Sequence, residues 1–145
     1  GREDPVLQAP TPIEIAMTYP AELRYTKEHE WARVDGDTVR VGVTSYAVDQ
    51  LGDVTLVDLP AVGTAVGAHA RFGEIESVKT VSELFSPVGG TITAVNGDLE
   101  GTPETVNEAP YEAGWLVEIK MSDASQLDGL MDAKQYADYI GKLEG

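Results

Sequence analysis

The chain has 145 residues, about the length of one domain and enough to bury a hydrophobic core. Ten basic against 25 acidic residues give a formal net charge of −15, so we expect no binding to nucleic acid phosphates or anionic membranes. The absence of cysteine excludes disulfides, thiolate nucleophiles and cysteine-bound metals. No apolar run approaches the ~20 residues that cross a bilayer.

The N-terminal stretch, residues 1–18, is interpreted as a disordered tail or as sequence added for expression. It holds three of the eight prolines. It shows neither the apolar core of a signal peptide nor the arginine-rich amphipathic pattern of a transit peptide. We therefore expect the folded domain to span residues 19–145.

Short runs rich in β-branched and aromatic residues recur between turn signals, of which Asp35-Gly36 is a strong hairpin signal. Because strands and helices do not alternate regularly, a doubly wound parallel sheet is disfavoured. The pattern predicts a mainly β fold, a flattened sandwich or barrel of antiparallel sheets with peripheral helices and a helical C-terminus. The predicted strands are residues 22–34, 38–43, 53–60, 71–78, 80–86, 91–95 and 115–121.

Three helices are predicted from capping residues: Thr44 or Ser45 before the first, Ser122-Asp123 before the second and Asp132 before the third. The helices are expected at residues 45–52, 123–130 and 132–143. In the last, an apolar stripe of Tyr136, Tyr139, Ile140 and Leu143 indicates core packing. Residues 61–70 and 99–114 are predicted to be loops.

Several kinds of active site are not supported by any motif. The two histidines, His29 and His69, lack metal-ligand spacing. The glycines form no phosphate-binding pattern, and no GxSxG marks a serine hydrolase. We therefore predict no catalytic residue and no metal site.

Lys79 stands out as the only basic residue in GEIESVKTVSELFSP (73–87), with Glu74, Glu76 and Glu83 around it. The flanking residues are strand-like and contain no glycine or asparagine, so the pattern predicts a tight bend with Lys79 at its tip. An exposed lysine on an edge is usually unremarkable. A long amine on a rigid tip is also what a modifying enzyme or a swinging-arm carrier needs.

The motif GEIESVKTVSELFSPVGG (73–90) closely resembles the lipoate attachment region of the glycine cleavage system H protein family. Three further segments resemble the family in the same order: YTKEHEW (25–31), GVTSYAVDQLGDVTLVDLP (42–60) and TPETVNEAPYEAGWLVEIK (102–120). The resemblance covers residues 19–143. It implies a lipoyl/biotinyl-like barrel-sandwich hybrid. Biotin carriers usually place their lysine between two methionines, whereas Val78 and Thr80 flank Lys79, which favours lipoate.

The resemblance implies that Lys79 carries a covalent lipoyl group and that the protein is a carrier and not an enzyme. Its expected partners are a pyridoxal-phosphate glycine decarboxylase, a tetrahydrofolate aminomethyltransferase and dihydrolipoyl dehydrogenase. A lipoate ligase, or lipoyl synthase with an octanoyltransferase, is expected to modify it. The chain would shuttle an aminomethyl group between the first two enzymes and deliver the dithiol to the third. We expect a monomer in the bacterial cytoplasm, or in the mitochondrial matrix if the source is eukaryotic.

The family match also assigns roles to four acidic residues. Glu30 matches an acid that faces the aminomethyl arm, and the alternative is an exposed strand residue. Glu83 stands where many relatives have aspartate, and Glu28 where relatives often have serine. Glu76 is expected to help the lipoylating enzyme recognise its site. For Asn107, a structural role in the long loop is expected.

Three other functions remain open at this stage. They are an H-like protein that relays lipoyl groups, a lipoyl domain of a 2-oxoacid dehydrogenase, and an acidic binding module without lipoate. The EHEW segment and the helical C-terminus favour the glycine cleavage family, since lipoyl domains usually lack both.

Overall fold

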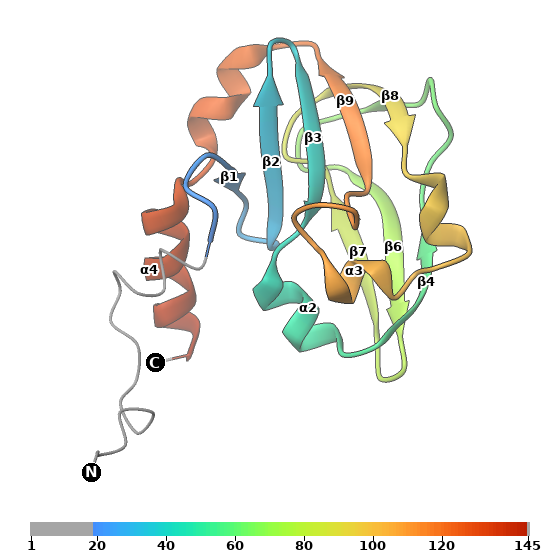
Figure 1. Cartoon of the computed structure of the whole chain (residues 1–145). Coiled ribbons are helices and arrows are strands. Elements are labelled where there is room, and N and C mark those ends of the chain that lie inside the picture. The colour runs from blue at the N-terminus through green and yellow to red at the C-terminus, as the bar shows by residue number, and fades with distance from the viewer. Residues whose placement is uncertain (1–18, 145) are drawn as a thin grey trace.

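The computed structural model describes residues 19–144 and consists of two antiparallel β-sheets with short helices around them (Figure 1). The predicted mainly β class is confirmed. The interpretation of residues 1–18 lies outside the described residues. Among the described residues, no helix is both long and apolar enough to span a membrane.

The larger sheet has six strands in the order β1-β2-β3-β9-β8-β5, and the smaller has three in the order β4-β6-β7. The strands of the larger sheet are β1 (Arg24–Tyr25), β2 (Glu30–Asp35), β3 (Thr38–Val43), β9 (Val117–Met121), β8 (Gly90–Val95) and β5 (Ala65–Val66). The strands of the smaller sheet are β4 (Val54–Asp58), β6 (Arg71–Ser77) and β7 (Val81–Phe85).

The helices are all short except the last. They are α2 (Ser45–Leu51), the 3₁₀ helix η2 (Gly97–Glu100), α3 (Thr105–Glu108), the 3₁₀ helix η3 (Ala124–Gly129) and α4 (Ala133–Glu144). The Thr44 side chain caps α2, and Gly52 ends it at a φ of 73°. At α4, Asp132 Oδ1 accepts the Gln135 N–H, while Gln135 Oε1 accepts the Asp132 N–H. This reciprocal capping box explains why α4 begins where the sequence predicted.

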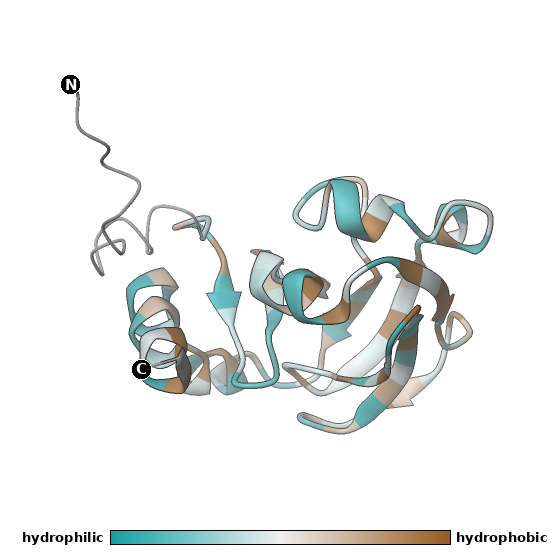
Figure 2. Cartoon of the chain, turned by 90° about the horizontal axis from the view of Figure 1, so that it is seen from below, coloured by the Kyte–Doolittle hydropathy of each residue, from teal (hydrophilic) through white to brown (hydrophobic). Residues whose placement is uncertain are grey.

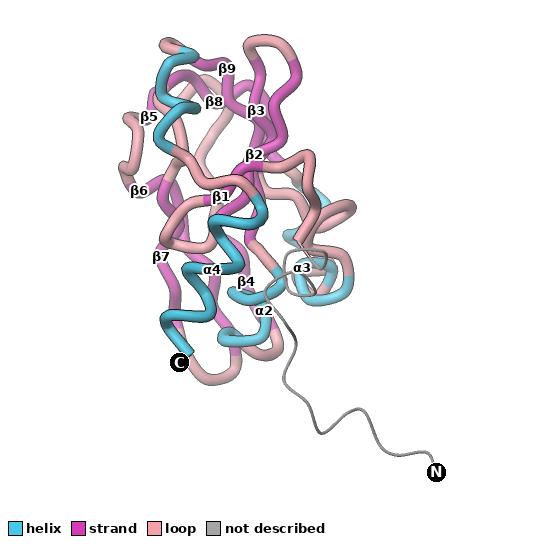
Figure 3. Tube along the Cα trace, turned by 90° about the vertical axis from the view of Figure 1, so that its left-hand side faces the viewer, coloured by secondary structure: helices cyan, strands magenta, loops and turns pink. Residues whose placement is uncertain are grey.

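The main core lies between the two sheets and consists of aliphatic side chains with one phenylalanine, among them Val41, Ile75 and Ile92. A second cluster, half of whose buried members are aromatic, joins α4 to β1 and β2. Its buried members are Tyr19, Leu23, Tyr25, Trp31, Ala133, Tyr136, Ala137 and Ile140. Figures 1 and 3 place α4 beside β1, at the edge of the larger sheet. Figure 2 shows hydrophobic and hydrophilic residues alternating along the strands and around the C-terminal helix.

Several local predictions were wrong in detail. The predicted strand 22–34 is broken between Tyr25 and Glu30, since Thr26 N–H donates to Glu30 O and His29 N–H to Thr26 O. The predicted loop 61–70 contributes strand β5, and the loop 99–114 contains α3, whose Val106 is fully buried. Residues 124–129 form a 3₁₀ helix. Leu143 is 51% exposed and does not belong to the α4 core face.

Candidate functional site

Lys79 lies at the tip of the β6–β7 hairpin, as predicted. The two strands are antiparallel, and Glu76 pairs with Val81 in the last rung before the bend. Val78, Lys79 and Thr80 are all exposed. Figures 1 and 3 show the tip at one end of the molecule, near α2. Lys79 is therefore exposed at the end of a two-stranded support.

The bend is closed by Ser77, a residue that can hydrogen-bond to its own turn. The Ser77 N–H donates to Thr80 O at 2.8 Å. The Ser77 hydroxyl oxygen accepts the N–H groups of Thr80 at 3.1 Å and of Lys79 at 3.4 Å. Serine hydroxyls commonly accept backbone N–H groups in turns. Because Ser77 stabilises the bend in this way, the bend forms from residues other than glycine.

No ion pair holds the Lys79 amine among residues 19–144. Its stem lies over the end of α2, where a Cβ placed on Gly52 would be 3.4 Å from Lys79 Cε. The expected ring of carboxylates around Lys79 is not what the structure shows. Arg71 binds two of the three acids, Glu74 at 2.8 Å and Glu83 at 3.2 Å.

Glu76, the predicted recognition residue, lies on β6 next to the tip and is half-buried. Its backbone carbonyl accepts the Thr55 hydroxyl at 3.2 Å, which ties β6 to the start of β4. Glu76 lies three positions before Lys79 in the chain. Its recognition by a modifying enzyme stays a prediction.

A cleft of about 310 Å³ lies between α2 and the hairpin, next to the lysine tip. The α2 wall presents Tyr46 and Gln50, one helical turn apart, and the floor includes Leu51. The remaining lining residues are Glu28, His29, Ala47, Thr80, Val81 and Ser82. Glu28, one of the predicted arm contacts, is exposed at its rim.

Glu30 does not line this cleft. Its side chain is 1% exposed, so the alternative that it is simply an exposed strand residue is wrong. One carboxyl oxygen accepts the Thr26 hydroxyl at 2.6 Å, and the other accepts the Phe85 N–H at 3.1 Å. Burial raises the pKa of Glu30 to about 7. Glu30 thus joins the corner between β1 and β2 to the end of β7.

His29 is a cleft residue that sequence reasoning did not select. Its φ is +73°, a conformation that non-glycine residues rarely adopt. The Nδ1 atom lies 2.9 Å from the Tyr136 hydroxyl, which lies 2.7 Å from Thr44 Oγ1. Burial lowers the pKa of His29, with a smaller opposing effect from Glu28, so the ring is neutral near pH 7. This chain connects the cleft to α4 and to the cap of α2.

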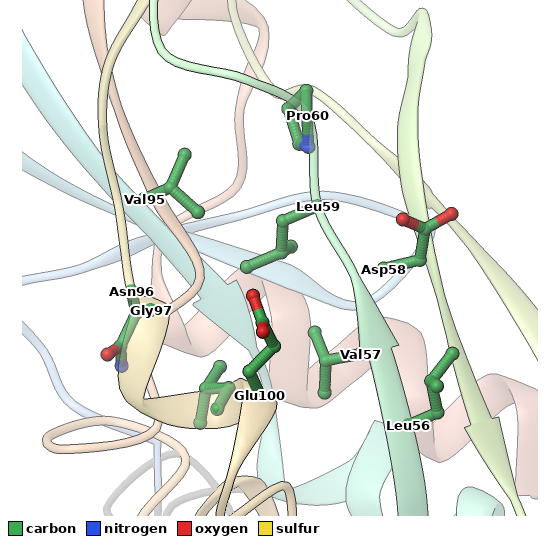
Figure 4. A pocket seen from close by; sticks show the side chains of 10 residues that line it. Leu56, Val57, Asp58, Leu59, Pro60, Val95, Asn96, Gly97 and Glu100 are labelled. Carbon is green, nitrogen blue, oxygen red and sulfur yellow. The ribbon is translucent and has the colours of Figure 1, made fainter.

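A second cavity, of about 400 Å³, lies between β4 and η2 (Figure 4). Leu56, Val57 and Leu59 form one side, and Val95 lies opposite. The figure shows the Glu100 carboxylate reaching towards Leu59 and Val57. None of the predicted site residues lines this cavity.

Comparisons with known proteins identify the family. The family model of the glycine cleavage H-protein matches residues 23–143. A glycine cleavage system H protein from Geobacillus thermodenitrificans is 52% identical over 126 residues, which are 87% of this chain and 99% of that protein. The one from Staphylococcus carnosus is 51% identical over 126 residues, covering 87% of this chain and all of the relative.

A solved structure supports the same assignment. The crystal structure of a glycine cleavage system H protein from Mycobacterium marinum aligns with a TM-score of 0.76 and 40% sequence identity. The alignment covers 84% of this chain and 98% of that one. The chain therefore belongs to the glycine cleavage H-protein family.

Proposed function

We propose that the protein is the lipoate-bearing carrier of a glycine cleavage system and that Lys79 is its attachment residue. The observation that carries the proposal is the position of Lys79. It is exposed at the tip of a two-stranded hairpin, unpaired by any described acid, in a chain of this family. A covalently attached lipoyl group supplies the redox-active disulfide, which this chain cannot provide because it contains no cysteine.

The cleft beside the tip fits an organic arm of this kind. Its volume of about 310 Å³ is within the range of ~300–1,000 Å³ that small-molecule pockets usually have. Leu51, Ala47 and Val81 offer apolar surface, while Tyr46 and Gln50 offer polar groups. We propose that an arm attached to Lys79 folds back into this cleft.

A cationic aminomethyl group on the arm would meet an acidic rim at Glu28. That carboxylate is exposed and lines the cleft. A charge-assisted hydrogen bond of this type contributes about 1.5–3 kcal/mol when it is shielded from water. The predicted arm contacts of Glu30 and Glu83 stay predictions. Each would have to exchange existing bonds, to Thr26 and Phe85 for Glu30 and to Arg71 for Glu83.

The chain itself would catalyse no step. Its partners would be the pyridoxal-phosphate glycine decarboxylase, the tetrahydrofolate aminomethyltransferase and dihydrolipoyl dehydrogenase, together with a lipoylating enzyme. The net charge of −15 supports contacts with basic surfaces on those partners. A carrier that visits several enzymes must expose its tip to each, so we propose a monomer with transient contacts. The relatives named above are bacterial, which supports a location in the bacterial cytoplasm.

The first test is site-specific lipoylation. The purified protein is incubated with lipoate, ATP and a lipoate ligase, and intact mass and peptide mapping are recorded. We expect one lipoyl adduct, located on Lys79, and none on Lys79→Arg. Lys120→Arg is the matched control, because Lys120 is also an exposed strand-associated lysine. An adduct that persists in Lys79→Arg contradicts the attachment site.

The second test addresses the pathway. The lipoylated protein is combined with glycine decarboxylase, and glycine-dependent exchange of carbon dioxide is measured. Exchange that requires the lipoylated form supports the glycine cleavage role. A fully lipoylated protein that supports no exchange contradicts the pathway but leaves the carrier role intact.

A further inference from the structure

Asn107, in the short helix α3, makes two hydrogen bonds with a single stretch of backbone. Its Nδ2 donates to the Gly52 carbonyl oxygen at 2.8 Å, and its Oδ1 accepts the Val54 N–H at 2.9 Å. Both ends of the side-chain amide are therefore used. The Asn107 amide pairs with the Gly52 carbonyl and with the N–H of Val54, two residues further on. A neighbouring parallel β-strand would bond to this segment in the same way.

The backbone that Asn107 holds is the support of the lysine tip. Asp53 O, between the two bonded residues, accepts the Val78 N–H at 3.0 Å. Val54 pairs with Ser77 in the first rung of the β4–β6 ladder. These contacts attach the start of the bend to the segment that Asn107 holds, while Val78, Lys79 and Thr80 stay exposed.

The same segment also contacts the lysine side chain. A Cβ on Gly52 would lie 3.4 Å from Lys79 Cε, so the stem of Lys79 lies over a residue without a side chain. Gly52 has a φ of +73°, which glycine tolerates but which does not by itself hold the chain in place. The bond from Asn107 to the Gly52 carbonyl restrains this conformation directly.

We propose that Asn107 is a positioning residue for Lys79: by clamping Gly52–Val54 it fixes the tip of the β6–β7 hairpin for the enzyme that modifies the lysine. The inference rests on the proposed function of Lys79. The side-chain hydrogen bonds of Asn107 go to Gly52 and Val54 and not to the lysine. Asn107 acts through the Asp53 carbonyl and the Val78 N–H.

The expected consequence is a change in preorganisation. An enzyme that binds a tip already held in place spends little binding free energy on ordering it, whereas a loose tip must be ordered at each encounter. Loss of the clamp should therefore raise the KM for the acceptor protein in lipoylation. The kcat should change much less, since the amine reacts in the same way once it is bound.

The test compares Asn107→Asp and Asn107→Ala with a matched control, Asn96→Asp. Asn107→Asp keeps the acceptor and loses the donor, and Asn107→Ala loses both. The Asn96 amide likewise bonds to backbone on both sides, away from the lysine tip: its Nδ2 donates to Ala113 O and Trp115 O, and its Oδ1 accepts the Asp98 N–H. Three quantities are measured on each full-length variant: urea stability, hydrogen exchange of the Val78 amide by NMR, and lipoylation kinetics with lipoate, ATP and a lipoate ligase.

Relative to the control, we expect the protection of the Val78 amide to fall by about two- to tenfold in the Asn107 variants, the change that loss of a hydrogen bond of ordinary strength produces. The KM for the acceptor should rise by a similar factor, with kcat within about twofold. Asn96→Asp should reduce urea stability without either change. If Asn107→Ala does not fold, the isosteric Asn107→Asp carries the test.

Equal Val78 protection and equal KM in the Asn107 and Asn96 variants would overturn the inference. This result differs from failure of the proposed function, in which the unmodified wild-type protein accepts no lipoate. The Val78 measurement needs no modifying enzyme, so it tests the clamp even in that case.

Discussion

The lysine tip and the corner at Glu30 hold their ionisable side chains in opposite ways. Lys79 is exposed, has no ion pair among the described residues and is positioned through backbone hydrogen bonds. Glu30 is 1% exposed and is held directly, with both carboxyl oxygens bonded to protein groups. The two lie at opposite ends of β7, since Glu30 bonds to Phe85 at the end of this strand that is farther from the lysine bend.

Because of this difference, we expect substitutions at Lys79 and at Glu30 to affect different properties of the protein. A solvated amine at a tip contributes little to folding, because water satisfies it in both the folded and the unfolded chain. A buried carboxyl contributes or costs much more, because its environment changes completely on folding. Changes at the tip should therefore affect modification with little effect on stability. Changes at the corner should affect stability with little effect on modification.

The largest effect is expected at Trp31, which follows Glu30 in β2. The ring is fully buried, and its Nε1–H donates to Pro110 O at 2.9 Å. Trp31→Ala should lower the free energy of unfolding by about 3–5 kcal/mol, as large-to-small changes at buried aromatic sites do. Urea unfolding measures this. The control is Trp115→Ala, at a partly exposed ring, where a loss as large as that of Trp31→Ala would contradict the prediction.

The next effect is a pH dependence due to Glu30. Its pKa is raised from 4.5 to about 7 by burial, so the folded protein keeps a proton that the unfolded chain releases. The stability that this group contributes is present below about pH 4.5 and is lost as the pH rises to about 7, a change of roughly 3 kcal/mol at most.

Glu30→Gln should remove this dependence. The amide can still accept the Phe85 N–H, and it can donate to the Thr26 oxygen. We therefore expect the variant to be more stable than the wild type near pH 8 and to show a flatter stability profile between about pH 4.5 and about pH 7. Urea unfolding across this range provides the measurement. Glu28→Gln, at the exposed neighbour whose charge contributes less than burial to the raised pKa of Glu30, should change the slope much less than Glu30→Gln. An unchanged slope in Glu30→Gln would refute the assignment.

At the tip, Lys79→Arg should change the free energy of unfolding by less than about 0.5 kcal/mol, as expected for an exposed site. It should nevertheless abolish the lipoyl adduct. Trp31→Ala and Glu30→Gln should instead change the free energy of unfolding and retain the adduct in the folded fraction. The comparison between the two regions fails if Lys79→Arg destabilises the protein as much as the buried substitutions do.

The smallest effect is expected for Glu83→Gln. Its carboxylate pairs with Arg71 at the surface, where both side chains are about half exposed. Exposed ion pairs contribute about 0–1 kcal/mol, and salt screens them. The loss of stability should be less than about 0.5 kcal/mol and should vanish at about 1 M salt. A larger loss that persists in salt would show that Glu83 has a second, shielded partner.

The site itself was only partly predictable from the sequence. The position of Lys79 at a bend follows from local strand signals, and the structure agrees. The grouping of Glu28, Glu30 and Glu83 around an arm does not follow from position in the chain. Glu28 and Glu30 are two residues apart, yet one lines the cleft and the other is buried. No local pattern marks His29 as a cleft residue, because its contact with Tyr136 spans 107 positions.

Elements that depend on neighbouring residues were determined by the sequence alone. The hairpin at Asp35-Gly36, the caps of α2 and α4, and the bend at Lys79 each depend on hydrogen bonds that span a few residues, so their signals are local. Tertiary structure decided what depends on distant partners: the division into two sheets, the burial of Glu30, and the bonds from Asn107 to residues more than 50 positions away. The physical reason is that burial and long-range hydrogen bonding are properties of the packed chain, which no short window of residues contains.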